Sequence, residues 1–143
     1  MPNLSLEERI SRSLARGSAT VFLREDFRRF GGYDQVGRVL RALVRRGALV
    51  RAGYGIYVKA RASTLSGQPV PVEPLVSIGL EAMRKLGVRA DLGAATRAHC
   101  EGRTTQIPMA AVINVGNSMV SRRIGFGSGV LRYERTPSTE RHK

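Results

Sequence analysis

Residues 34–46, DQVGRVLRALVRR, restrict the fold of this chain more than any other segment. On an α-helix at about 100° per residue, one face collects aliphatic side chains: Val36, Leu40 and Leu43, with Val44 beside them. The opposite face collects arginines within roughly 60°: Arg38, Arg41 and Arg45. No acidic residue follows Asp34 in the segment, so ion pairs between residues four apart do not explain these arginines. We therefore expect a helix with one buried and one positive face, capped by Asp34 and ended by Gly47.

The neighbouring segments place this helix in a larger pattern. Residues 24–30 are expected to form a short helix with Phe27 and Phe30 on one side, ended by two glycines. Two short strands, LVRA and IYVK, follow residue 47 and are joined by the glycine-rich turn GYG. In the second strand, Tyr57 is expected to face the core. Helix, turn, helix and hairpin in this order predict a winged helix-turn-helix domain.

Helix-turn-helix proteins place their second helix in the major groove of DNA, where arginine can pair with guanine. The pattern therefore assigns Arg38, Arg41 and Arg45 to contacts with bases or phosphates. Other contacts are assigned around them: Gln35, which could pair with adenine, Arg51 and Tyr54 on the hairpin, and Arg28 and Arg29 on the first helix. Arg122 and Arg123 are candidates for a second basic surface, since neighbours on a strand face opposite sides. A plain solvated arginine is an equally open alternative.

The charge of the chain agrees with a nucleic-acid target. Its 143 residues include 24 Lys and Arg against 11 Asp and Glu, a formal charge of +13, which attracts polyanions. Only three of the basic residues are lysine, and arginine suits bidentate contact with phosphate or guanine, although a GC-rich genome gives the same bias. Winged helices also dock onto proteins. A module that binds an acidic protein is therefore the alternative, with RNA as a further target.

The remaining patterns predict an α+β protein in two parts. A helix over 5–16 should begin at a capping box formed by Ser5 and Glu8. The C-terminal part should contain a helix over 75–86, a helical patch over 92–99, and an antiparallel sheet of strands 110–115, 119–126 and 129–134. The expected organisation is as follows: 1–60 winged helix-turn-helix domain, 61–74 proline-containing linker, 75–135 small α+β module, and 136–143 flexible tail.

Several classes of protein are not expected. The N-terminal MPNLSLEER lacks the pattern of a signal peptide, and no apolar run approaches the roughly 20 residues of a membrane span, so we expect a cytoplasmic protein. Cys100 is the only cysteine, and His99 and His142 cannot form a metal site alone. Adjacent residues such as His99, Cys100 and Glu101 point about 100° apart on a helix, so no catalytic pair is assigned. We expect a buried structural cysteine, no enzyme activity, no metal and no cofactor.

Two longer runs resemble a known family. The first, VFLREDFRRFGGYDQVGRVLRALVRRGALVRAGYGIYVKAR, is similar to the winged-helix domain of AbiEi-type antitoxins from bacterial type IV toxin–antitoxin systems. The second, EGRTTQIPMAAVINVGNSMVSRRIGFG, carries the less generic landmarks RTTQIP, NVG and SRRIGFG. Together they extend the resemblance from about residue 18 to residue 135.

The resemblance implies a DNA-binding repressor of its own promoter. The oligomeric state stays open, and pairs of protomers on inverted repeats are one arrangement. It also implies that the C-terminal part counters a nucleotidyltransferase-like toxin without forming a stable complex with it. This chain is shorter than the larger members of that family, so a reduced C-terminal module is expected. Such proteins also occur as stand-alone regulators on mobile elements, and this alternative stays open.

Overall fold

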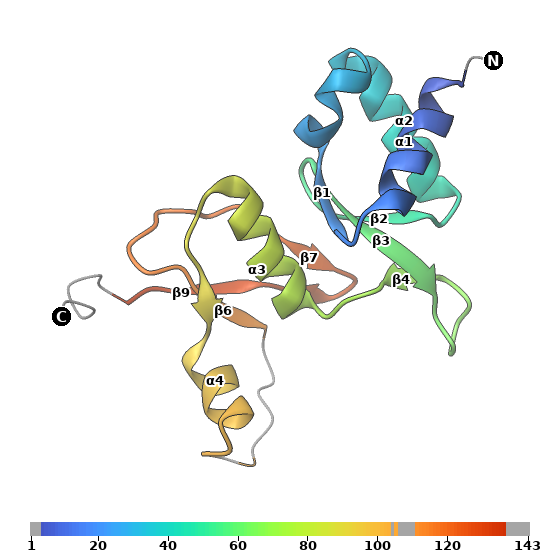
Figure 1. Cartoon of the computed structure of the whole chain (residues 1–143). Helices are drawn as coiled ribbons and strands as arrows, with labels where there is room; N and C mark the ends of the chain where they lie inside the picture. The colour runs from blue at the N-terminus through green and yellow to red at the C-terminus, as the bar shows by residue number, and fades with distance from the viewer. Residues whose placement is uncertain (1–3, 104, 106–110, 137–143) are drawn as a thin grey trace. The chain divides into compact units, whose positions relative to one another are not determined.

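The computed structural model describes residues 4–103, 105 and 111–136. The chain is α+β and divides into two compact units, Met1–Glu73 and Pro74–Lys143 (Figure 1). No helix within the described residues is both long and apolar enough to cross a membrane.

The first helix of unit 1, α1 (Leu6–Arg16), begins at the capping box expected from the sequence. The Ser5 hydroxyl accepts a hydrogen bond from the Glu8 backbone N–H at 3.1 Å, and the Glu8 carboxylate accepts one from the Ser5 N–H at 2.8 Å. These two bonds satisfy backbone donors that the first helical turn otherwise leaves unpaired. Ile10 and Leu14 on the apolar stripe are buried.

The short helix expected over residues 24–30 is a 3₁₀-helix, η1 (Arg24–Phe30). Asp26 fixes its first turn, because its carboxylate accepts a hydrogen bond from the Leu23 N–H at 2.9 Å. A 3₁₀-helix has three residues per turn, so side chains three apart point the same way. Phe27 and Phe30 accordingly lie on one side, with ring centroids 6.3 Å apart.

The helix predicted over residues 34–46 is α2 (Tyr33–Arg45), and its buried and exposed faces are those predicted. Its cap differs from the expected one. Gly32, not Asp34, is the N-cap, and the Gln35 side-chain oxygen accepts a hydrogen bond from the Gly32 N–H at 3.3 Å. The cap lies two residues earlier than expected, which puts Gln35 at the position whose side chain reaches back to the cap. Gly47 follows the helix end with φ +82°, as expected for a helix-terminating glycine.

The sheet of unit 1 has the antiparallel order β1 (Val21–Leu23), β3 (Ile56–Ala62), β2 (Leu49–Gly53). A bulge lies between Arg51 and Gly53, next to the predicted hairpin turn. Tyr57 is buried in the core, as predicted. That core joins α1, η1 and α2 to the sheet through these side chains: Ile10, Leu14, Phe22, Phe27, Val36, Leu40, Leu43, Leu49 and Tyr57.

Most of the segment 61–74, expected to be a linker, belongs to unit 1. Strand β3 extends to Ala62, and β4 (Pro69–Pro71) pairs with it antiparallel. The prolines do favour extended backbone, but that backbone forms an edge strand, where a missing N–H is tolerated. Ser63 N–H donates to the Gln68 carbonyl at 2.8 Å and closes the loop between the two strands.

Unit 2 contains α3 (Leu75–Leu86) and α4 (Ala94–Cys100), close to the two helices expected there. Its sheet has the order β5 (Asp91–Leu92), β6 (Val112–Asn114), β9 (Arg132–Glu134). The β5–β6 pair is antiparallel and includes a strand, β5, that was not predicted, whereas β6 and β9, expected in an antiparallel sheet, run parallel. Strands β7 (Gly125–Phe126) and β8 (Gly129–Val130) form a separate hairpin. Of the predicted strand 110–115, Ala111 and Val115 lie outside β6, and Ala110 lies outside the described residues.

The prediction of a strand over 119–126 is wrong for most of its length, because only Gly125–Phe126 is extended in a sheet. The side chain of Arg135, the residue after β9, occupies carbonyl groups that a strand partner would use. Arg135 donates from Nε to the Ser118 carbonyl at 2.8 Å and from Nη2 to the Val120 carbonyl. The predicted strand 129–134 is likewise divided at the buried Leu131, whose N–H donates to the Ile124 carbonyl at 2.8 Å.

Cys100 is exposed, which corrects the expectation of a buried cysteine. It is the last residue of α4, a short helix with no buried residue. The neighbouring Glu101 carboxylate lies 2.9 Å from Arg103 Nη2, so it is engaged elsewhere. Within the described part of the chain, no group of three or more His, Cys, Asp or Glu side chains could hold a metal ion.

Candidate nucleic-acid interface

The positive face of α2 is exposed to solvent. Its three arginines are exposed: Arg38, Arg41 and Arg45. The opposite face is at most 3% exposed at Val36, Leu40 and Leu43, so burial of the apolar side fixes the direction of the arginines. Among residues 4–103, 105 and 111–136, no carboxylate forms an ion pair with these three arginines. Arg46, one residue beyond the helix, is different because it pairs with Glu7 of α1.

The β2–β3 hairpin presents Arg51 and Tyr54 at its tip, as predicted. Tyr54 is 69% exposed, and the Arg51 guanidinium carbon lies 5.9 Å from its ring centroid. Arg51 Nε also donates to the Gly53 carbonyl at 3.2 Å. An arginine held by an aromatic ring and a backbone carbonyl loses less conformational freedom on binding than an unrestrained one. The tip therefore offers a preorganised cation and an exposed ring.

The other predicted contact residues of unit 1 lie on the surface, but two of them, Gln35 and Arg29, already form contacts within the protein. Gln35 is exposed, yet its side-chain oxygen caps α2, which leaves its amide N–H groups as donors. Arg28 and Arg29 are exposed on η1. Arg29 lies over the Phe30 ring at 4.5 Å and donates to the Asp26 carbonyl at 3.2 Å. Gln35 is thus first a helix cap, and base contact would use the donors that remain.

Sequence reasoning missed Tyr33 and Arg24. Tyr33, the first residue of α2, is 62% exposed, and its hydroxyl lies 3.3 Å from the hydroxyl of Tyr54. The α2 start and the hairpin tip are therefore joined by a pair of tyrosines. The Tyr54 hydroxyl raises the pKa of Tyr33 above its ordinary 10.0, while nearby Arg24 acts in the opposite direction.

Arg24 contacts Tyr33 with both its charge and its donors. Its guanidinium carbon lies 3.6 Å from the Tyr33 ring centroid, and Nη2 donates to the Tyr33 carbonyl at 2.8 Å. The guanidinium occupies space beside Gly37, where a Cβ atom would collide with it. A glycine at a buried helix position is the one indication in the sequence that another group approaches the backbone there.

Arg122 and Arg123 of unit 2 are exposed, but they do not lie on the predicted strand. They belong to an irregular segment that β9 holds in place. Besides the two bonds from Arg135, the Tyr133 hydroxyl donates to the Arg122 carbonyl at 2.5 Å. Burial raises the pKa of Tyr133 above 10.0, so its hydroxyl remains a donor to higher pH than that of an exposed tyrosine.

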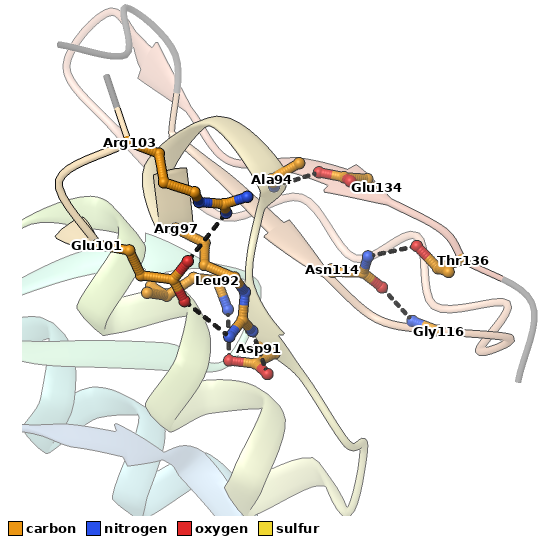
Figure 2. A network of polar contacts seen from close by, with 10 residues as sticks. All are labelled: Asp91, Leu92, Ala94, Arg97, Glu101, Arg103, Asn114, Gly116, Glu134 and Thr136. Carbon is orange, nitrogen blue, oxygen red and sulfur yellow. Dashed lines mark hydrogen bonds and ion pairs between the residues drawn. The ribbon is translucent and has the colours of Figure 1, made fainter. Parts of the chain in front are cut away.

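Unit 2 also contains a cleft of about 740 Å³ between the 87–92 segment, α4 and the 114–118 segment. Four charged side chains form a chain of ion pairs there (Figure 2): Asp91, Arg97, Glu101 and Arg103. The Leu92 N–H and then Arg97 lower the pKa of Asp91 below its ordinary 3.8. The Glu134 carboxylate accepts a hydrogen bond from the Ala94 N–H at 3.0 Å. Because these positive and negative groups pair with one another, the network fixes α4 against the sheet.

These features define an α+β protein with an exposed, arginine-rich helix face and an adjoining hairpin. Residues 5–140 match DUF6088, a family of unknown function, and the chain belongs to this family. The chain is also similar to the crystal structure of the RV2827C protein from Mycobacterium tuberculosis, with 18% sequence identity and a TM-score of 0.59. That similarity covers 95% of this chain and 46% of the other, so this chain spans less than half the length of that protein. At this identity the likeness concerns the fold alone. No curated protein matches the sequence.

Proposed function

We propose that this protein binds double-stranded DNA through α2 and the β2–β3 hairpin and acts as a transcriptional repressor. The observation that carries the proposal is the exposed face of α2, where three arginines point into solvent without a carboxylate partner among the described residues. Unpaired guanidinium groups in a row suit phosphate oxygens and guanine edges. The hairpin tip, with Arg51 and Tyr54, supplies a second element for the sugar–phosphate backbone.

The order of elements supports the same proposal. Arg24–Phe30, a glycine turn, α2 and the hairpin follow one another as in a winged helix-turn-helix domain, although the first helix is 3₁₀. In such domains the second helix enters the major groove and the hairpin lies along the backbone. Here α2 would be the helix that enters the groove.

The salt dependence of DNA binding tests the proposal. If about five phosphates are contacted, log K should fall against log salt with a slope of roughly −4 to −5, at about −0.9 per contact. The DNA should be the region upstream of the protein's own gene, with an unrelated duplex as competitor. A slope near zero, or equal binding to both duplexes, would contradict a sequence-specific repressor.

Arginine substitutions locate the interface. Arg38→Ala and Arg45→Ala should each weaken binding, and a lost phosphate contact should reduce the slope by about 0.9. Arg12→Ala is the matched control, because Arg12 is an exposed arginine on α1 of the same unit. If all three variants weaken binding equally, the overall positive charge of unit 1 drives binding, and the face of α2 has no special role. If Arg38→Ala unfolds the protein, that arginine is structural.

Within this proposal, the resemblance to AbiEi-type antitoxins supports autoregulation of a toxin–antitoxin operon. A nucleotidyltransferase-like gene beside this one, whose toxicity the protein suppresses, would be the expected context. Absence of such a neighbour would favour a stand-alone regulator of a mobile element.

The second candidate is a module that docks onto an acidic protein. The same exposed arginines favour it, because they would pair equally well with carboxylates. Binding to duplex DNA alone distinguishes the two candidates, because a module specific for an acidic protein would bind the upstream duplex no more tightly than an unrelated one.

A further inference from the structure

Arg24 is placed between the two elements that the proposed interface requires. Its backbone N–H donates to the Gly55 carbonyl at 2.9 Å, which ties it to the hairpin turn. Its side chain donates to the Tyr33 carbonyl at 2.8 Å and lies against the Tyr33 ring, which ties it to the start of α2. One residue of η1 therefore connects the hairpin and the helix.

The tyrosine pair closes this connection into a ring of contacts. Tyr33 meets Tyr54 through their hydroxyls at 3.3 Å, and Tyr54 precedes Gly55, which returns to Arg24. We call this ring, made of Arg24, Tyr33, Tyr54 and Gly55, the bracket. Gly55 has φ +70°, so the turn that brings its carbonyl to Arg24 also favours a residue without a Cβ atom.

The bracket is maintained at a cost. Arg24 Nε is buried and has no hydrogen-bond partner among the described residues, which is unfavourable for a guanidinium group. Gly37 replaces a better helix former in α2, and its missing side chain makes room for the guanidinium. The unpartnered Nε and the helix glycine each destabilise the fold, and both belong to the contact between Arg24 and α2. A contact of this kind is expected where geometry is needed for function.

We propose that Arg24 is a positioning residue and that the bracket sets the placement of the hairpin tip relative to α2 for DNA binding. This inference rests on the proposed function. The bracket fixes where Arg51 and Tyr54 stand with respect to the arginines of α2. With the bracket intact, the free protein already holds both elements in their binding arrangement, which lowers the ordering cost of association.

The test compares Tyr33→Phe, Tyr54→Phe and the double variant in DNA binding. Each single change removes the same hydroxyl–hydroxyl bond, so each should weaken binding about 3–10-fold, the range of one hydrogen bond. The double variant should be no weaker than the single variants. Multiplied losses in the double variant would mean that each hydroxyl contacts DNA by itself, and would overturn the inference. Tyr57→Phe, the same chemical change in the buried core, is the matched control and should bind as the unaltered protein does.

Gly37→Ala disturbs the bracket without changing an exposed side chain of α2, because the new Cβ displaces the Arg24 guanidinium. It should weaken DNA binding as much as Arg24→Ala, and the two changes together should be no worse than either one. Unchanged affinity of folded Gly37→Ala would overturn the inference. Thermal unfolding of each variant confirms that binding is compared between folded proteins.

These experiments distinguish a failure of the positioning role from a failure of the DNA-binding proposal. If Arg38→Ala weakens binding and the tyrosine variants do not, the DNA-binding proposal stands and the positioning role of the bracket fails. If the unaltered protein binds no DNA, both fail together.

Discussion

Gly37 and Arg24 should show strong coupling in a stability measurement that involves no DNA. Gly→Ala in a helix interior ordinarily stabilises by about 1 kcal/mol. Here the added Cβ meets the Arg24 guanidinium, the far end of a flexible side chain, so Arg24 moves away rather than the helix. That movement loses a hydrogen bond worth about 1 kcal/mol and a cation–π contact worth about 1 kcal/mol. Gly37→Ala should therefore destabilise unit 1 by about 1 kcal/mol.

In an Arg24→Ala background the same substitution has no guanidinium to displace. Gly37→Ala should then stabilise the protein by about 1 kcal/mol, which gives a coupling energy of about 2 kcal/mol. Urea denaturation of the four proteins, with unfolding followed by circular dichroism, measures the cycle. Equal stabilisation by Gly37→Ala in both backgrounds would refute the packing of Arg24 against the helix.

Three further outcomes are expected. Leu40→Ala should lower the free energy of unfolding by about 2–5 kcal/mol, because this α2 side chain is fully buried in the core of unit 1. A smaller loss in urea denaturation would mean that Leu40 is not packed in that core. The raised pKa of Tyr33 means that the tyrosine pair stabilises the fold below pH 10.0 and loses this effect as pH rises through the raised value. Tyr54→Phe should lower that pKa in a tyrosinate absorbance titration, and an unchanged titration would exclude the hydroxyl bond. The pKa of Asp91 is lowered in the folded protein, so its ionised carboxylate stabilises the fold above pH 3.8, and this stabilisation is lost as pH falls through the folded pKa. Asp91→Asn should therefore make the free energy of unfolding less dependent on pH in acid.

The faces of α2 could be predicted from the sequence because a helix converts residue spacing directly into direction. Leu40 and Arg38 are two residues apart and therefore face different sides whatever the rest of the chain does. The N-cap was expected at Asp34, two residues after the observed Gly32, so the capping role of Gln35 was missed. Boundaries are set by side-chain bonds of a few residues, and several cap patterns compete there.

Segments whose structure depends on distant side chains could not be predicted in the same way. Residues 119–124 were expected to continue a strand, but Tyr133 and Arg135 bind the carbonyl groups of Ser118, Val120 and Arg122 instead. The prolines of 69–71 indicated extended backbone correctly. They did not indicate that β3 would continue far enough to pair with it. In both cases the residues that determine the structure lie outside the segment, so its own residue pattern could not predict the pairing.

The bracket illustrates the same limit at the candidate site. Arg24 is one of 24 basic residues, and nothing local separates it from Arg28 or Arg29. Only the fold brings its backbone to Gly55 and its side chain to Tyr33. The one sequence feature that indicates this contact is Gly37, a glycine in a helix whose other buried positions are aliphatic. Helix propensity argues against glycine there, so its presence has to be explained by a neighbour. A glycine that interrupts the buried face of a basic helix is therefore a specific guide to the groups that orient the helix, and here it leads to Arg24.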